Sequence, residues 1–118
     1  CGCLALPGGF VEYGENPDDG VLRELAEETG LTGRDPRPLT IAGHPQRDPR
    51  KHVVSVIYLV EVSTDDVAIA GDDAAEIIWS RISDLPPIHD EAWAFDHGQI
   101  VHDALQHPWV IKQGVVNE

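Results

Sequence analysis

The most constraining feature of the sequence is a group of three glutamates on one face of a predicted helix. Glu24, Glu27 and Glu28 are spaced i, i+3 and i+4, so their side chains project from the same side. They lie in the last turns before Gly30, where the helix dipole disfavours anions. A hard divalent cation with oxygen ligands offsets this repulsion most directly. The pattern therefore predicts a magnesium site, commonly used for phosphate chemistry. The alternative is a solvated acidic helix face.

Local signals place the ends of this helix. Asn16 is a preferred N-cap residue, and Pro17 suits the first helical position. Gly30 supplies a left-handed stop at the other end. Arg23 lies four residues before Glu27 and can therefore pair with it. Four apolar residues are expected to pack inward: Val21, Leu22, Leu25 and Ala26.

The segment from the loop before the helix to its end resembles the Nudix box. Gly9, five further residues, Glu15, seven further residues and the run 23–31 fill all nine fixed positions. Leu25 and Leu31 stand at the two aliphatic positions. The resemblance is to the Nudix hydrolases. It implies an α+β fold in which a mixed β-sheet is sandwiched between helices (α/β/α).

The resemblance also implies a reaction and a metal site. Nudix enzymes hydrolyse a nucleoside diphosphate linked to another moiety, with Mg²⁺ or Mn²⁺. Glu24 and Glu28 would be the main metal ligands, and Glu27 a third ligand or a base. The carbonyl oxygen of Gly8, just before the box, would be a further ligand. The flexible backbone at Gly8 and Gly9 allows a ligand or metal to come close.

Further catalytic roles follow from the same resemblance. Arg23 would orient Glu27, and Glu15 would tie the loop to the helix. Many Nudix enzymes use another carboxylate outside the box, and Glu76 is the first candidate here, with Asp73 second. The alternative for both is a solvated acidic loop.

Three other segments resemble the ADP-ribose pyrophosphatase-like branch of the family, namely 6–15, 47–56 and 94–97. The expected reaction is hydrolysis of ADP-ribose to AMP and ribose 5-phosphate. Two alternatives stay open. One is hydrolysis of a nucleoside triphosphate or another sugar nucleotide, and the other is a non-catalytic ADP-ribose-binding module.

Two arginines are candidate substrate contacts, together with Gly9. Arg47 and Arg50 carry rigid guanidinium groups that match phosphate oxygens. The structural alternative is that these loop arginines pair with Asp48 or Glu12.

The remaining sequence is consistent with one domain over residues 1–118. Strands are expected at 37–44, at 53–60 as a fully buried central strand, and at 75–82. A helix is expected at 97–106, with Asp96 and Gln99 as a capping box. Its buried stripe would be Ile100, Val101, Ala104 and Leu105.

The composition of the chain excludes some classes of binding partner. The net charge of -13 argues against nucleic acid and anionic membranes, and the longest apolar run is too short to span a bilayer. Cys1 and Cys3 are too close along the chain for an ordinary disulfide, which favours the cytoplasm.

The chain has no methionine and begins at Cys1, a few residues before the box. We therefore expect an N-terminally truncated domain that lacks its first strand. The resulting open sheet edge favours pairing with a second copy as a homodimer.

Overall fold

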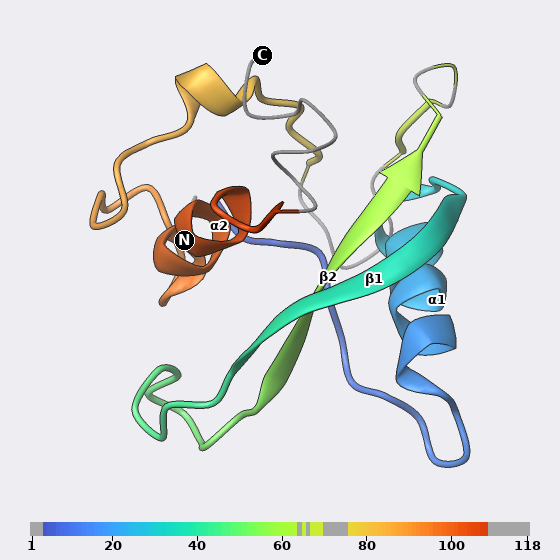
Figure 1. Ribbon diagram of the computed structural model, residues 1–118, viewed down its shortest axis with the longest axis horizontal. Coiled ribbons are helices and arrows are strands. Elements are labelled where there is room, and N and C mark those ends of the chain that lie inside the picture. Colours follow the sequence, from blue (N-terminus) through green and yellow to red (C-terminus); the bar gives the residue numbers. More distant parts are fainter. Residues whose placement is uncertain (1–3, 64, 66, 70–75, 109–118) are drawn as a thin grey trace. The chain divides into compact units, whose positions relative to one another are not determined.

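The computed structural model describes residues 4–63, 65, 67–69 and 76–108. Its elements, in chain order, are α1 (Pro17–Thr29), β1 (Gly33–Ala42), β2 (Ser55–Val62), the 3-10 helix η1 (Ile82–Asp84) and α2 (His97–Leu105) (Figure 1). The chain forms two compact units. The α1 unit comprises Pro7–Pro38 and Tyr58–Trp79, and the α2 unit comprises Cys1–Leu6, Leu39–Ile57 and Ser80–Glu118.

Helix α1 begins and ends where the sequence predicts. The side chain of Asn16 accepts a hydrogen bond from the Asp18 backbone N–H at 2.9 Å, which caps the first turn. Gly30 has φ +71°, and its N–H donates to the carbonyl of Ala26 at 2.9 Å. This left-handed conformation favours glycine and ends the helix.

The inward face of α1 is narrower than predicted. Leu22, Leu25 and Thr29 lie along it, and Thr29 is 5% exposed, with its hydroxyl donating to the carbonyl of Leu25. Ala26 is exposed, so the expectation that it packs inward is wrong. The reason is geometric, since 100° per residue places Ala26 at the margin of a face centred on the other three residues.

Strands β1 and β2 pair as neighbours in a two-stranded sheet and run in opposite directions (Figure 1). β1 starts at Gly33, earlier than the predicted 37, and contains Pro36 and Pro38. Proline cannot donate to a strand ladder, and it is tolerated where a strand has a neighbour on one side only. A Cβ at Gly33 would lie 2.9 Å from the side chains of Leu22 and Leu25. Glycine therefore lets α1 approach the strand closely.

Tyr58 joins β2 to the first turn of α1. Its hydroxyl donates to the carboxylate of Asp18 at 2.7 Å. Burial, reinforced by this hydrogen bond and by the negative charge of Asp18, raises the pKa of Tyr58 to about 12. The phenol is therefore neutral and can donate throughout the neutral pH range.

The expectation of a fully buried central strand at 53–60 is wrong. β2 covers Ser55–Val62, none of its residues is fully buried, and Val56 is 44% exposed. Among the described residues, β1 is the only strand paired with it. The apolar composition predicted a strand correctly, but burial depends on what packs against the two faces.

The strand expected at 75–82 is also not found over 76–82, while residue 75 lies outside the described part of the chain. Ile78 and Trp79 are exposed, and η1 begins at Ile82. A short apolar run becomes a strand only when a neighbouring strand accepts its backbone hydrogen bonds.

Helix α2 confirms the predicted helix at 97–106 to within one residue. Ile100 is 6% exposed and forms the small core of the α2 unit with Trp93. The predicted capping box is wrong, because the Asp96 side chain makes no capping hydrogen bond. Gln99 instead donates to Asp103 at 2.7 Å.

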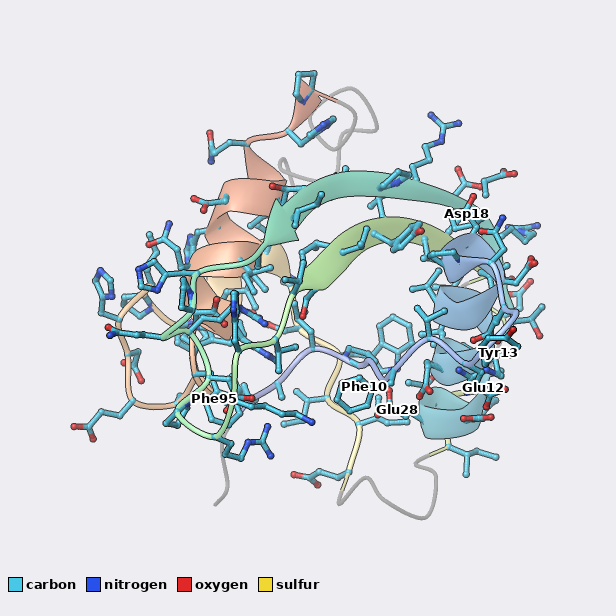
Figure 2. The ribbon with its side chains drawn as sticks, turned by 90° about the horizontal axis from the view of Figure 1, so that it is seen from below. Phe10, Glu12, Tyr13, Asp18, Glu28 and Phe95 are labelled. Atoms are coloured by element: carbon cyan, nitrogen blue, oxygen red, sulfur yellow. The ribbon has the colours of Figure 1, made fainter. Side chains whose placement is uncertain are left out.

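Two loops that precede helices present aromatic side chains to solvent. Phe10 and Tyr13 belong to the loop before α1, and Phe95 precedes α2 (Figure 2). None of the helices that the structure describes is both long enough and apolar enough to cross a membrane.

The packing around Gly98 gives a test of the α2 unit. A Cβ at Gly98 would overlap the carbonyl oxygen of Ile88 and lie 2.6 Å from Trp93. Because a backbone carbonyl cannot move cheaply, Gly98→Ala is expected to lower the free energy of unfolding by about 1–3 kcal/mol. Urea denaturation measures this. Gly43→Ala is the control, because the nearest atom to its added methyl lies 3.8 Å away. Equal unfolding midpoints for the two variants would contradict the packing.

Candidate active site

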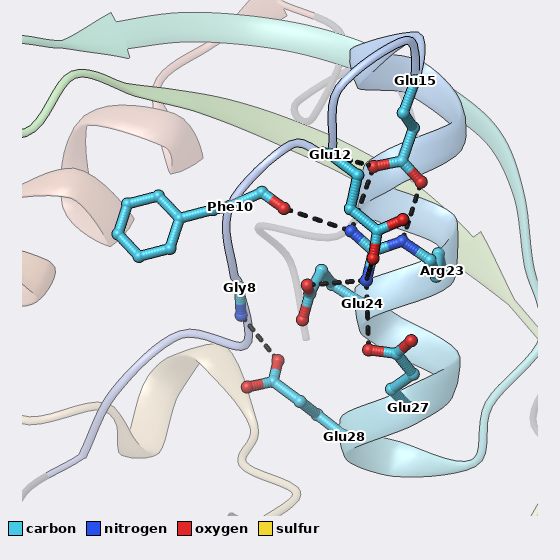
Figure 3. A network of polar contacts seen from close by, with 8 residues as sticks. All are labelled: Gly8, Phe10, Glu12, Glu15, Arg23, Glu24, Glu27 and Glu28. Carbon is cyan, nitrogen blue, oxygen red and sulfur yellow. Dashed lines mark hydrogen bonds and ion pairs between the residues drawn. The ribbon is translucent and has the colours of Figure 1, made fainter.

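Arg23 lies at the centre of a network of carboxylates in the α1 unit (Figure 3). Its Nε and Nη2 donate to the two carboxylate oxygens of Glu15, at 2.7 and 3.0 Å. Its Nη1 donates to Glu24 at 2.9 Å and to Glu27 at 3.1 Å. The predicted pairing of Arg23 with Glu27 is therefore present. One guanidinium group holds three carboxylates of the box at once, and these four residues are called the Arg23 network below.

The Arg23 network also fixes the loop before α1. Nη2 of Arg23 donates to the backbone carbonyl of Phe10 at 3.1 Å. Glu15 accepts the backbone N–H of Glu12 at 3.0 Å, and the Glu12 carboxylate lies 3.6 Å from Nη1 of Arg23. Gly14 has φ +80°, which allows the chain to turn back between Glu12 and Glu15. The loop is thereby tied to the helix, as predicted for Glu15.

Electrostatics keep the Arg23 network charged. Hydrogen bonding to Arg23 is the largest cause that lowers the pKa of Glu15 to about 2, followed by the backbone N–H of Glu12, while desolvation opposes both. Hydrogen bonding to Glu15 raises the pKa of Arg23 further above its ordinary value, with smaller contributions from Glu24 and Glu27. Both groups are therefore ionised at any pH near neutrality.

The glycine loop contacts the same helix face. The backbone N–H of Gly8 donates to Oε2 of Glu28 at 2.7 Å (Figure 3). A Cβ on Gly9 would overlap the carboxylate of Glu24. Glycine is therefore required at this position for the close approach of loop and helix, a role that the sequence indicated only in general terms.

The residues on this face of α1 supply oxygen donors of the kind that a divalent cation prefers. Glu24, Glu27 and Glu28 share one helix face beside the Gly8 backbone, and carboxylate and carbonyl oxygens are the ligands that hard cations prefer. Over the described ranges, no three His, Cys, Asp or Glu side chains already converge as a metal-binding group. Glu24 and Glu27 point to Arg23 instead, and Glu28 to the Gly8 amide. The assignment of these residues as ligands of a divalent cation therefore rests on the type of their donor atoms and on their common helix face. It stays a prediction.

The two predicted substrate arginines belong to the α2 unit. The side chain of Arg47 is 8% exposed, and it donates to both oxygens of Asp96 at 2.8 and 3.1 Å. It also donates to the carbonyl of Val53 at 3.3 Å and to Oγ of Ser55 at 3.0 Å. These contacts match the structural alternative for Arg47, although its partner is Asp96 and not Asp48 or Glu12. They also explain why Asp96 does not cap α2.

Arg50 has an accessible guanidinium group. Its side chain is 70% exposed, donates to both oxygens of Asp48 at 3.0 and 2.8 Å, and lies 5.0 Å above the Phe95 ring. Hydrogen bonds from Arg50 lower the pKa of Asp48 to about 2. Arg50 thus pairs with Asp48, as the structural alternative proposed, while its exposed surface leaves room for a ligand.

The predicted carboxylate outside the box lies in the α1 unit. Glu76 is exposed and is not part of the Arg23 network. The second candidate, Asp73, lies outside the described residues.

Two groups that contact Arg23 were not predicted from the sequence, namely the backbone carbonyl of Phe10 and the carboxylate of Glu12. The Tyr13-Gly14 pair, typical of a turn, was the signal that could have brought Glu12 back toward Glu15.

Comparisons with known proteins identify the family to which the chain belongs. The model of the NUDIX domain family matches residues 2–104. An ADP-ribose pyrophosphatase of Methanocaldococcus jannaschii is 42% identical over 105 residues, which cover 89% of this chain and 59% of that protein. An NAD-capped RNA hydrolase NudC of Escherichia coli is 32% identical over 85 residues, which cover 72% of this chain and 32% of that protein.

A solved structure supports the fold. The crystal structure of a MutT/nudix family protein from Enterococcus faecalis superimposes with a TM-score of 0.72 and 32% identity, covering 90% of this chain and 52% of that one. The chain therefore belongs to the Nudix family, with an α+β fold. It spans a little more than half the length of the M. jannaschii and E. faecalis relatives.

The low pKa of Glu15 predicts an acid-sensitive contribution to stability. Its folded value of about 2 lies below the ordinary 4.5, so the contribution is fully present above about pH 4.5 and is lost as pH falls toward 2. Glu15→Gln is therefore expected to be less stable than the original chain at pH 6, with the difference shrinking between pH 4.5 and pH 2. Urea denaturation across this range measures the difference. Glu91→Gln, at an exposed glutamate of the α2 unit, is the control. A difference independent of pH would contradict the charged hydrogen bond.

Proposed function

We propose that this chain hydrolyses the pyrophosphate bond of a nucleoside diphosphate derivative, with ADP-ribose as substrate and AMP and ribose 5-phosphate as products. The observation that carries the proposal is the arrangement of three glutamates beside the glycine loop. Arg23 holds Glu24 and Glu27, Glu28 accepts the Gly8 N–H, and Gly9 lies against Glu24. The M. jannaschii relative is named an ADP-ribose pyrophosphatase, which supports the choice of ADP-ribose.

Mg²⁺ or Mn²⁺ is the proposed cofactor, with Glu24, Glu28 and the Gly8 carbonyl as its main ligands and Glu27 as a third ligand or as the base. When bound, such an ion neutralises pyrophosphate oxygens and lowers the pKa of a bound water. In the reaction, the water oxygen bonds to one phosphorus, and the bridging oxygen leaves with the other phosphate. The proton released from water passes to a carboxylate. Glu27 is exposed and is a suitable acceptor.

The residues around the glutamates have supporting roles. Arg23 and Glu15 hold the loop on α1, so that Glu24 and Glu28 keep their places relative to the glycines. Glu76 is proposed as the additional carboxylate outside the box. Arg50 is proposed as a contact for phosphate or ribose, because its guanidinium group remains largely exposed. Arg47 would act only indirectly, by holding Asp96 and the end of its loop.

The charge balance supports a small nucleotide over an RNA substrate. The chain has 8 basic and 21 acidic residues, and RNA binding draws on clustered positive charge. We also propose that the protein is a cytoplasmic homodimer. Within the described residues, β1 and β2 each have one neighbouring strand, which leaves edges for a second copy.

Glu28→Gln tests the proposed chemistry. The change removes ligand charge with little change in volume, and the new amide oxygen can still accept the Gly8 N–H. Release of AMP from ADP-ribose, with Mg²⁺ or with chelator, is expected to fall by about 100-fold or more at unchanged stability. Glu91→Gln serves again as the control. Activity within about tenfold of the original would place the metal elsewhere. No release by the original chain with any nucleotide diphosphate derivative would refute the proposed function.

Gly9→Ala tests the position of Glu24. The added methyl group would overlap the Glu24 carboxylate, which must then move away from the loop. We expect kcat/KM to fall by about tenfold or more, because small misplacements of reacting groups are costly. Urea unfolding and Mg²⁺-dependent kinetics are measured together, with Gly43→Ala for comparison. Unchanged kinetics would mean that this contact is not needed for turnover.

A further inference from the structure

Phe95 has an unusual backbone conformation for an aromatic residue. Its φ is +49°, in the left-handed region that favours glycine, and the residue is 52% exposed (Figure 2). The ring therefore gains only part of the stabilisation that burial would give it, while the backbone is strained. Glycine would adopt this conformation without strain, so the fold by itself does not require an aromatic side chain here.

The two neighbours of Phe95 hold it in this conformation. The N–H of Ala94 donates to the carbonyl of Leu4 at 2.8 Å. The carboxylate of Asp96 accepts two hydrogen bonds from Arg47, at 2.8 and 3.1 Å. All five residues belong to the α2 unit. Strained backbone persists only where the surroundings fix it in this way, and it is concentrated at functional sites.

His97 fixes the same segment from the side of α2. Its backbone N–H donates to the carbonyl of Ala94 at 3.0 Å, and its Nδ1 accepts the N–H of Leu6 at 2.9 Å. The imidazole ring lies 6.3 Å from the ring of Phe95, with the two planes inclined at 60°. The two rings are thus inclined to each other and not stacked.

Arg50 lies over the ring of Phe95 and is itself held in place. Its Cζ is 5.0 Å from the ring centroid. Its Nε, Nη2 and backbone N–H all donate to Asp48, whose residue is only 9% exposed. The side chain of Arg50 is nevertheless 70% exposed. Because one edge of the guanidinium group is bound to Asp48 and one face is turned to Phe95, the opposite face is left to solvent.

This geometry suits a planar ligand group better than an anion alone. Guanidinium planes and aromatic rings both stack with nucleobases. An anion approaching the Nε–Nη2 edge would have to displace the carboxylate of Asp48, which also repels it. Nη1 takes no part in the bonds to Asp48, so Arg50 can still contact the ribose or phosphate of a ligand whose base stacks on it.

We propose that Phe95 and Arg50 form a platform on which the planar base of a nucleotide stacks. The ligand class is a nucleoside phosphate. The choice of adenine as the base rests on the proposed function, since ADP-ribose is the proposed substrate. Phe95 then gives the α2 unit a preference for ligands that carry a base, and the strain at its backbone is the cost of presenting the ring.

The composition of the chain makes this platform easy to observe. The sequence contains two phenylalanines, Phe10 in the α1 unit and Phe95 in the α2 unit. Labelling phenylalanine with ¹³C therefore gives one reporter ring at the platform and one internal reference. AMP and ribose 5-phosphate are titrated separately into the metal-free chain, because they differ in the adenine base. The dissociation constant of AMP is read from its own base protons, which can be followed in every variant.

We expect AMP to shift the Phe95 ring signals in a saturable way, and ribose 5-phosphate to leave them in place. Phe95→Leu keeps apolar bulk but removes the ring, and it is expected to raise the dissociation constant of AMP about fivefold or more. Phe95→Tyr keeps the ring and is expected to stay within about twofold of the original chain. Trp79→Leu, which removes an exposed aromatic ring from the α1 unit, is the control.

Phe95→Gly keeps the test valid if Phe95→Leu does not fold. Because glycine relieves the strain at φ +49°, this variant is expected to keep the urea unfolding midpoint while it loses AMP affinity as Phe95→Leu does.

Three results would overturn the platform. They are a metal-free chain that does not bind AMP or binds it with the Phe95 signals unmoved, equal AMP affinity in Phe95→Gly and the original chain, and equal shifts of the Phe95 ring with ribose 5-phosphate and AMP. Hydrolysis of ADP-ribose with Mg²⁺ is assayed separately. Its absence would refute the proposed function, whereas the metal-free titration reports on the platform alone, so the two failures are distinguishable.

Discussion

The bidentate ion pair between Arg23 and Glu15 organises the α1 unit. Like-charged side chains on one helix face repel each other, and a nearby cation must compensate for them. Arg23 supplies that compensation for Glu24 and Glu27, while its other nitrogens hold Glu15 and the Phe10 carbonyl. One side chain thereby both balances the acidic face and fastens the loop to it.

Arg47 also forms a bidentate ion pair, but in the α2 unit, and its side chain is only 8% exposed. The pair is with Asp96, at 2.8 and 3.1 Å, and Nη1 of Arg47 donates to the carbonyl of Val53 and to Oγ of Ser55. These contacts link the loop before β2 to the start of α2. Arg50 also pairs with an aspartate, but its side chain is 70% exposed, which is why Arg50 and not Arg47 is the proposed ligand contact.

Sequence reasoning succeeded where local rules dominate. The ends of α1 followed from Asn16 and Gly30, whose roles depend on backbone geometry within one turn. The pairing of Arg23 with Glu27 followed from helical spacing. The reasoning failed where distant segments decide the outcome. The capping role of Asp96 was lost to Arg47, which lies 49 positions away, and the run at 76–82 has no described partner strand.

The sequence by itself determined the helix, the acidic face and membership of the Nudix family, because the box residues lie within 23 consecutive positions, 9–31. Only the tertiary structure decided which donors those carboxylates meet. Whether Glu28 meets the Gly8 amide, and whether His97 holds Leu6, depends on how segments 20 and 91 positions apart come together. Such contacts are set by packing and by the need of each polar group for a partner, which short-range spacing does not specify.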